Sequence, residues 1–165
     1  VDRSPERIAR LNQNLDRLGL KVETAVADAV RWRPAAPVDA VLLDAPCTGT
    51  GTIRRHPEIA RVRAERDIAR LTAVQDALLD AAAEMVRPGG TLVYSVCSLE
   101  PEEGPDRIAG LLARRPEFHR RPVVPAEVGG LAELVTPKGD LRTLPAHLAP
   151  LGGMDGFYAA RLIRT

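Results

Sequence analysis

The sequence predicts an α/β domain with a mostly parallel sheet and helices on both faces. Short apolar runs end at turn signals, which is typical of buried parallel strands, and they alternate with longer segments that have helical spacing. Acids or thiols directly follow several of the apolar runs. The 165 residues, 45% hydrophobic and 27% charged, fit one globular domain with a core of its own.

Composition excludes several classes of protein. The 23 basic and 22 acidic residues give a formal net charge of +1, so there is no global nucleic-acid signature. Nearly all the basic residues are arginine, which suits phosphate recognition, although genome composition explains this bias equally well. The sequence has no long apolar run, no signal-peptide pattern and no cysteine pattern of a disulfide framework or a metal site. We therefore expect a reducing, cytoplasmic setting, no membrane contact and no metal.

The first third of the chain predicts a strand end, a helix and two strands. After Val1-Asp2, Ser4 is a good N-cap, Pro5 suits the first helical position, and Gly19 closes a helix over 5–18. Residues 21–27 alternate in polarity and predict a strand that ends at Asp28. A loop with two prolines leads to the apolar strand 38–44.

The rest of the chain continues the alternation of helices and strands. Residues 48–63 are polar and basic and predict a long functional loop with a short helical turn. A long helix over 65–87 ends at Pro88-Gly89-Gly90, which stops it. The remaining predicted elements are a strand over 91–97, a helix over 105–114, a strand over 118–124, a hairpin around 137–140 and a strand over 157–163.

Three of the predicted strands end in a chemically distinctive residue. They end at Asp28, at Asp44-Ala45-Pro46-Cys47 and at Cys97. Parallel strands bring their carboxyl ends to one edge of the sheet, so we expect these side chains to form a site there. The alternative is that each cysteine packs in the core as a small hydrophobic residue. A cysteine–histidine protease is not indicated, because the histidines are scattered along the sequence.

Two cysteine motifs carry a resemblance to a known family. Residues 44–58, Asp-Ala-Pro-Cys-Thr-Gly-Thr-Gly-Thr-Ile-Arg-Arg-His-Pro-Glu, closely resemble the signature of the Sun family, bacterial cytosine-C5 methyltransferases of 16S ribosomal RNA. Residues 94–103 resemble the second cysteine motif of that family, 2–7 its motif after the second strand, and 155–160 its C-terminal motif. The resemblance runs in order over essentially the whole chain. It implies a Rossmann-like class I methyltransferase fold, S-adenosylmethionine as cofactor and RNA, most of all ribosomal RNA, as partner.

The resemblance also implies roles for individual residues. Cys97 would attack cytosine C6 as the nucleophile, and Cys47 would assist the elimination that releases the product. Asp44 and the Pro46 carbonyl would hold the edge of the base, with Asp44 near the methyl donor as well. Asp2 would contact the ribose hydroxyls of the cofactor and Asp28 its adenine. Arg54 and Arg55, on the loop beside the site, are candidates for backbone phosphates, although a solvated loop is an equal alternative.

The sequence departs from the family pattern in three places. The family normally has a Gly-rich strand–loop–helix before this region, and the chain has none, so its first strand and cofactor loop are missing. We therefore expect residues 1–165 to be the C-terminal portion of one catalytic domain, inactive alone, with a gap or a rearranged pairing where that strand would lie. Gly104-Pro105 replaces an acid–amide pair, so the family pattern does not determine where the helix over 105–114 begins. Val96 replaces a threonine before the nucleophile.

Two other functions stay open at this stage. An amino-methyltransferase acting on an exocyclic nitrogen would use the acid–proline turn but would need neither thiol. A non-catalytic, truncated RNA-binding fragment would explain the absent cofactor loop. Exposed strand edges would in addition promote self-association of the chain.

Overall fold

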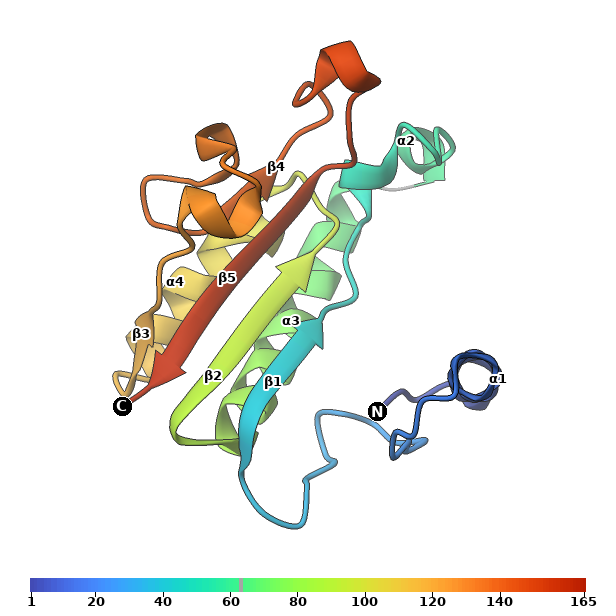
Figure 1. Ribbon diagram of the computed structural model, residues 1–165, viewed down its shortest axis with the longest axis vertical. Helices are drawn as coiled ribbons and strands as arrows, with labels where there is room; N and C mark the ends of the chain where they lie inside the picture. The colour runs from blue at the N-terminus through green and yellow to red at the C-terminus, as the bar shows by residue number, and fades with distance from the viewer. Residues whose placement is uncertain (63) are drawn as a thin grey trace.

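The computed structural model describes residues 1–62 and 64–165 and confirms the α/β class (Figure 1). The helices are α1 (Pro5–Leu18), α2 (Ile59–Val62), α3 (Glu65–Met85) and α4 (Pro105–Arg114). The strands are β1 (Val38–Asp44), β2 (Val86–Val96), β3 (Phe118–Arg120), β4 (Leu141–Thr143) and β5 (Phe157–Arg164). Short 3-10 helices are η1 (Thr50–Thr52), η2 (Pro101–Glu103), η3 (Pro125–Val128), η4 (Ala132–Leu134) and η5 (Ala149–Leu151).

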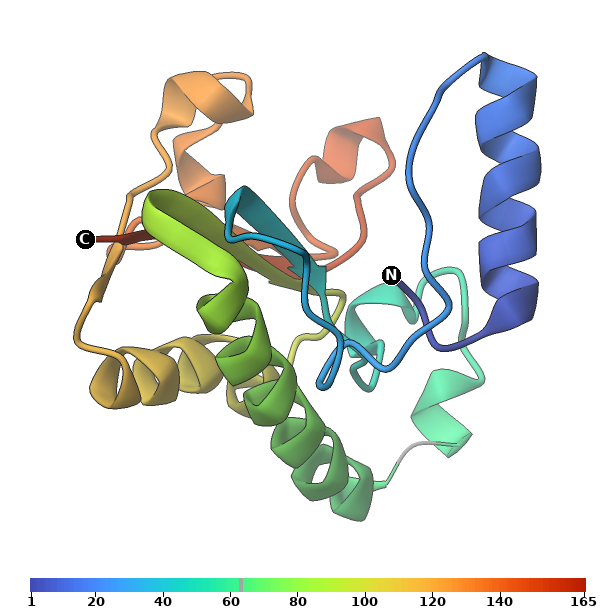
Figure 2. The ribbon, with the colours of Figure 1, turned by 90° about the horizontal axis from the view of Figure 1, so that it is seen from below.

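The sheet has the order β1-β2-β5-β3, with β4 paired to β5. β1 and β2 are parallel, whereas β5 runs antiparallel to β2, β3 and β4, so the sheet is mixed and not mostly parallel as predicted. α3 and α4 lie on one face, η3, η4 and η5 lie on the other, and α1 lies beyond β1 (Figure 2). The core between α3, α4 and the sheet contains Leu79, Tyr94, Ile108 and Tyr158.

Local sequence rules explain the confirmed elements. Ser4 caps α1 by accepting a hydrogen bond from Arg7 N, Pro5 occupies its first turn, and Gly19 ends it in the left-handed conformation. The strand over 38–44 and the helix over 105–114 have the predicted bounds. The loop after Cys47 contains η1 and α2 as short helical turns, and the last residue of the predicted loop, at position 63, lies outside the described residues.

The strand predicted over 21–27 is wrong. The structure has only a single parallel bridge there, between Asp2 and Val26. The alternating pattern favours an extended backbone, but a strand needs a hydrogen-bonded neighbour along its whole length. In the described residues, Asp2 is the one residue that pairs with this segment. Among the described strands, none pairs with the edge of β1 that faces away from β2. Leu42 on β1 is accordingly 72% exposed, and Leu11 and Leu18 on α1 are exposed as well.

Pro88-Gly89-Gly90 lies inside β2 instead of ending a helix. α3 ends at Met85, and the β1–β2 register jumps from Val38 opposite Val86 to Ala40 opposite Thr91. The chain therefore bulges out between these pairs, with Gly89 at a φ of 75°. Gly90 cannot carry a side chain, because a Cβ atom would lie 2.9 Å from Asp39 O. The strand over 118–124 is likewise shorter than predicted, since β3 ends at Arg120.

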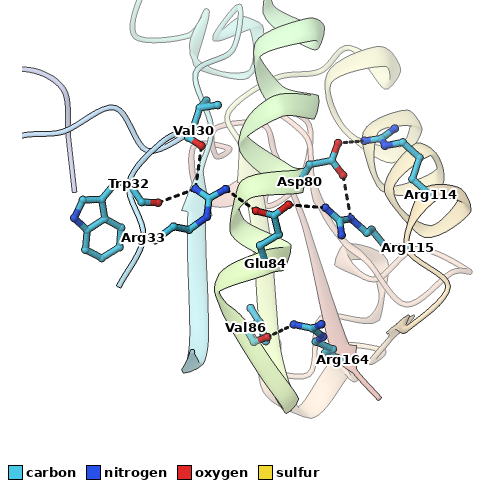
Figure 3. A network of polar contacts seen from close by, with 9 residues as sticks. All are labelled: Val30, Trp32, Arg33, Asp80, Glu84, Val86, Arg114, Arg115 and Arg164. Carbon is cyan, nitrogen blue, oxygen red and sulfur yellow. Dashed lines mark hydrogen bonds and ion pairs between the residues drawn. The ribbon is translucent and has the colours of Figure 1, made fainter. Parts of the chain in front are cut away.

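A chain of ion pairs joins α3 to α4 and to the segment before β1 (Figure 3). Glu84 accepts from Arg33 at 2.6 Å and from Arg115 at 3.1 Å, and Asp80 pairs with Arg114 and Arg115. Arg33 also donates to the carbonyls of Val30 and Trp32. Glu84 is thus the point at which the N-terminal segment is attached to the helical layer.

We predict that Glu84→Gln lowers the free energy of unfolding by about 0.5–1 kcal/mol at neutral pH, since the pairs are partly exposed. Hydrogen bonds from Arg33 and then Arg115 lower the pKa of Glu84 in the folded protein. This contribution is present above the ordinary carboxyl pKa and is lost as the pH falls through the lowered value. Urea unfolding at neutral and acidic pH measures it, with Glu133→Gln as an exposed control. An equal loss of stability in both variants would contradict the prediction.

Candidate functional site

The two cysteines meet at the carboxyl edge of the parallel strands. Asp44, the last residue of β1, lies opposite Ser95 of β2, so the chain segments that follow the two strands leave the sheet side by side. The Sγ atoms of Cys47 and Cys97 are 3.5 Å apart, and both residues are partly exposed. The two thiols thus lie together as expected, and neither cysteine is fully buried in the core.

The thiol–thiol contact makes the two cysteines chemically different. The hydrogen bond from Cys47 is the main cause that lowers the pKa of Cys97 to about 7. The same hydrogen bond, together with burial, raises the pKa of Cys47 far above its ordinary range. Cys47 therefore stays a thiol and donates to the Cys97 sulfur, which is substantially ionised at neutral pH. Only Cys97 has the charge state of a nucleophile.

A network of buried polar groups holds the two cysteine segments together. The residue after each cysteine is buried, and Thr48 Oγ1 and Ser98 Oγ lie 3.3 Å apart. Thr50 Oγ1 also lies 3.3 Å from Ser98 Oγ and accepts a hydrogen bond from Leu99 N. Every member therefore finds a partner, which burial of a polar group requires.

A glycine allows a close approach of three backbone segments. Gly51 N donates to Cys97 O at 3.0 Å, and Gly156 N donates to Gly51 O at 2.7 Å. A Cβ atom on Gly51 would lie 1.9 Å from Gly156 O, so no other residue fits without moving the backbone. The two cysteine segments and the turn before β5 are fixed to one another at this point.

Two further contacts surround this edge. Arg142 on β4 donates to the carbonyls of Ser98 and Leu99, directly after Cys97. Arg55 is held by Asp155 through its Nε at 2.7 Å, so its guanidinium has a protein partner already. Arg54, the other candidate for RNA phosphates, is exposed.

The predicted acids are divided between two places. Asp44 is exposed at the end of β1, close enough for its charge to oppose ionisation of Cys97, an effect that raises the pKa of that thiol but is outweighed by the Cys47 hydrogen bond. Asp2 and Asp28 lie instead on the N-terminal segment, where Asp2 N donates to Ala25 O and Ala27 N to Asp2 O. In the described residues no strand ladder joins that segment to β1.

Asp2 and Asp28 both have local hydrogen-bond partners. The Asp2 carboxylate accepts from Arg7 Nε and Nη2 and from Ser4 N, and the Arg7 contact is the main cause that lowers its pKa to about 2. Asp28 Oδ1 accepts from Val30 N in a turn. In the described part of the chain there is no group of three or more histidine, cysteine or acidic side chains suited to a metal, and no helix able to span a membrane.

Sequence reasoning missed two residues of the site, Glu103 and Gln75. Both are fully buried, and both contact the Cys47 segment. Glu103 looks like one more acid of an exposed loop. Gln75, however, lies midway between Leu71 and Leu79 on the buried side of α3, and a polar residue at that spacing is the signal that could have identified it.

Comparison with known proteins identifies the family. Residues 1–163 match the model of the family described as 16S rRNA methyltransferase RsmB/F. The chain belongs to this family. Relatives in the RsmB/F family include ribosomal RNA small subunit methyltransferase B of Pseudomonas syringae pv. tomato, 42% identical, and of Klebsiella pneumoniae, 40% identical, each over 99% of this chain. The chain spans 36% of the length of either relative.

Solved structures agree with this assignment. NSun6 from Pyrococcus horikoshii, solved with SFG, matches 99% of this chain and 40% of its own with a TM-score of 0.80 at 27% identity. The protein PH0851 matches 99% of this chain and 36% of its own with a TM-score of 0.83 at 33% identity. The expected class I methyltransferase fold is therefore confirmed for this RsmB/F chain.

We predict that Cys47→Ala raises the pKa of Cys97 from about 7 toward the ordinary thiol value of about 8.5, because the donor to its sulfur is lost. The ionised fraction at pH 7 then falls about tenfold or more. The rate of Cys97 alkylation by iodoacetamide, followed by mass spectrometry across pH, measures this change. Glu102→Gln is the control, since Glu102 is exposed and its side chain lies outside the network that holds the two thiols. An unchanged alkylation profile in Cys47→Ala would refute the prediction.

Proposed function

We propose that this chain carries the catalytic residues of an S-adenosylmethionine-dependent RNA cytosine-C5 methyltransferase that acts on 16S ribosomal RNA. The observation that carries the proposal is the 3.5 Å contact between an ionisable and a protonated thiol, beside Asp44 at the sheet edge. The family description and the names of the relatives support 16S ribosomal RNA as the substrate. An amino-methyltransferase would have no use for two convergent thiols, so the contact favours C5 chemistry over that alternative.

The proposed reaction begins with Cys97. Its thiolate forms a bond to cytosine C6, which turns C5 into an enamine carbon able to accept a methyl group. Asp44 and the Pro46 carbonyl accept hydrogen bonds from the edge of the base and hold it in place. The base must be unstacked or single-stranded to reach the sulfur, and Arg54, which is exposed on the adjacent loop, contacts a phosphate of the RNA.

Cys47 acts in the proposed release of the product. Loss of the C5 proton to a base re-forms the C5–C6 double bond and expels Cys97 as a thiolate. The S–H group of Cys47 donates to that sulfur and stabilises the charge that returns to it. The same hydrogen bond therefore assists Cys97 both as attacking group and as leaving group.

The carboxylates of Asp2, Asp28 and Asp44 are hydrogen-bond acceptors of the type that binds a nucleoside cofactor. The lowered pKa of Asp2, about 2, keeps its carboxylate an acceptor, and a carboxylate has more acceptor positions than Arg7 and Ser4 occupy. We assign Asp2 to the ribose hydroxyls, Asp28 to the adenine and Asp44 to the methyl-donor end. S-adenosylmethionine, when bound, supplies the methyl group as an electrophile.

We predict that the full-length protein with cofactor forms a covalent adduct with RNA that contains 5-fluorocytosine, because the fluorine blocks loss of the C5 substituent. Denaturing gel electrophoresis detects it. Cys97→Ala should abolish the adduct and Cys47→Ala should retain it. The reverse pattern would exchange the two roles. Retention of methyl transfer in a protein alkylated at both cysteines would instead favour the amino-methyltransferase.

We also propose that residues 1–165 form the C-terminal portion of the catalytic domain, and that the unpaired edge of β1 promotes self-association of this portion. We predict that residues 1–165 alone bind S-adenosylmethionine weakly or not at all, because the chain supplies acids for the nucleoside but no Gly-rich loop for the amino-acid end. Isothermal titration calorimetry measures this. Micromolar binding by residues 1–165 would overturn the prediction.

A further inference from the structure

Glu103 is a buried carboxylate in the middle of the cysteine network. It is fully buried, and no salt bridge to it occurs in the described residues. Its oxygens accept hydrogen bonds from Thr48 N at 3.0 and 3.1 Å, from Thr48 Oγ1, and from Gln75 Nε2 at 3.0 Å. A buried carboxylate without a cation is unfavourable unless several donors compensate it. Here three donor groups face it, and two of them belong to the residue after Cys47.

Gln75 extends these contacts to the residue before Cys47. Its Nε2 donates to Glu103 Oε1 and to Pro46 O, at 3.0 and 2.9 Å, which uses both hydrogens of the amide. The reversed amide would direct its oxygen at these two acceptors, so one orientation is fixed. Gln75 Oε1 is buried and has no partner in the described residues. A side chain that served packing alone would avoid that unfavourable burial.

Side chains of α3 and η2 therefore hold the residues on both sides of Cys47. Pro46 O is fixed by Gln75, and Thr48 N and Oγ1 are fixed by Glu103. Thr48 Oγ1 also lies 3.3 Å from Ser98 Oγ, which ties the same contacts to the residue after Cys97. In the described residues neither Glu103 nor Gln75 makes a hydrogen bond to a sulfur atom, but their hydrogen bonds hold the residues on both sides of Cys47.

We propose that Glu103 and Gln75 are positioning residues that hold the Cys47 thiol as the hydrogen-bond donor to the Cys97 sulfur. This inference rests on the proposed function for its catalytic consequence. If the Cys47 segment shifts, Cys97 loses the donor that stabilises its thiolate. Release of Cys97 from the adduct then slows more than attack, because attack recovers at high pH, where Cys97 ionises without help, whereas the leaving thiolate still lacks its donor.

The test compares Glu103→Gln and Gln75→Met with Glu102→Gln in the full-length protein. Glu102 is the exposed neighbour of Glu103 and is the matched control. Gln75→Met nearly preserves the side-chain volume and removes the unpaired Oε1 atom, so it remains informative where Glu103→Gln folds poorly. Each variant is mixed with cofactor and unmodified cytosine RNA at about pH 9, above the ordinary thiol pKa.

We expect both test variants to accumulate covalent RNA adduct, as Cys47→Ala should, with multiple turnover slowed about tenfold or more and adduct formation slowed less than about threefold. The control should match the unaltered protein. Equal slowing of formation and release, or behaviour like that of the unaltered protein, would overturn the positioning role.

A second measurement needs no RNA. Alkylation of Cys97 across pH should shift to higher pH in both test variants and not in Glu102→Gln, because the Cys47 donor is displaced. An unshifted profile overturns the inference even where turnover falls. Failure of the proposed function has a different signature, since the unaltered protein would then form no adduct with 5-fluorocytosine RNA while the shift in alkylation would persist.

Discussion

The distance between two sulfur atoms is the constraint on which the rest of this site depends. Two cysteines in identical environments would have equal acidities and no division of roles. The contact between Cys47 and Cys97 removes this equivalence, since one proton shared between neighbouring thiols leaves one of them anionic and the other a donor. Burial and the negative charge of Glu103 raise the pKa of both thiols, so the hydrogen bond between the two sulfurs is what separates their acidities.

The fold supplies this contact through three levels of structure. The parallel pairing of β1 and β2 brings the two strand ends to the same edge. The backbone hydrogen bonds through Gly51 then fix the segments beyond the strands, where the ladder no longer acts. The buried side chains of Thr48, Ser98 and Glu103 complete the arrangement with contacts that apolar packing could not provide, because only directional bonds define the position of a loop to a fraction of an ångström.

The sequence was informative wherever local rules dominate. The cap at Ser4, the stop at Gly19 and the apolar run into Asp44 depend on neighbours in the chain, and each has the predicted outcome. The predictions for the segment over 21–27 and for Pro88-Gly89-Gly90 were wrong because their conformation depends on distant partners. The first segment has too few partners, and the second bulges out between Val86 and Thr91, which pair with β1. The motifs likewise predicted both cysteines and Asp44, but not Glu103 or Gln75, whose importance arises from a contact across 28 residues.

The position of Gln75 also connects the site to the stability of the helical layer. α3 presents Gln75 to the cysteine segments near its middle, while Asp76, Asp80 and Glu84 on its other side pair with arginines of α4 and of the segment before β1. The ion pairs are partly exposed and individually weak. They add to the apolar packing that holds α3 against the sheet, and any sliding of that helix would move the Gln75 amide away from Pro46 O. A weak surface network can therefore influence the acidity of a thiol that it does not touch, because a rigid helix transmits its position to the buried Gln75 amide that contacts the loop.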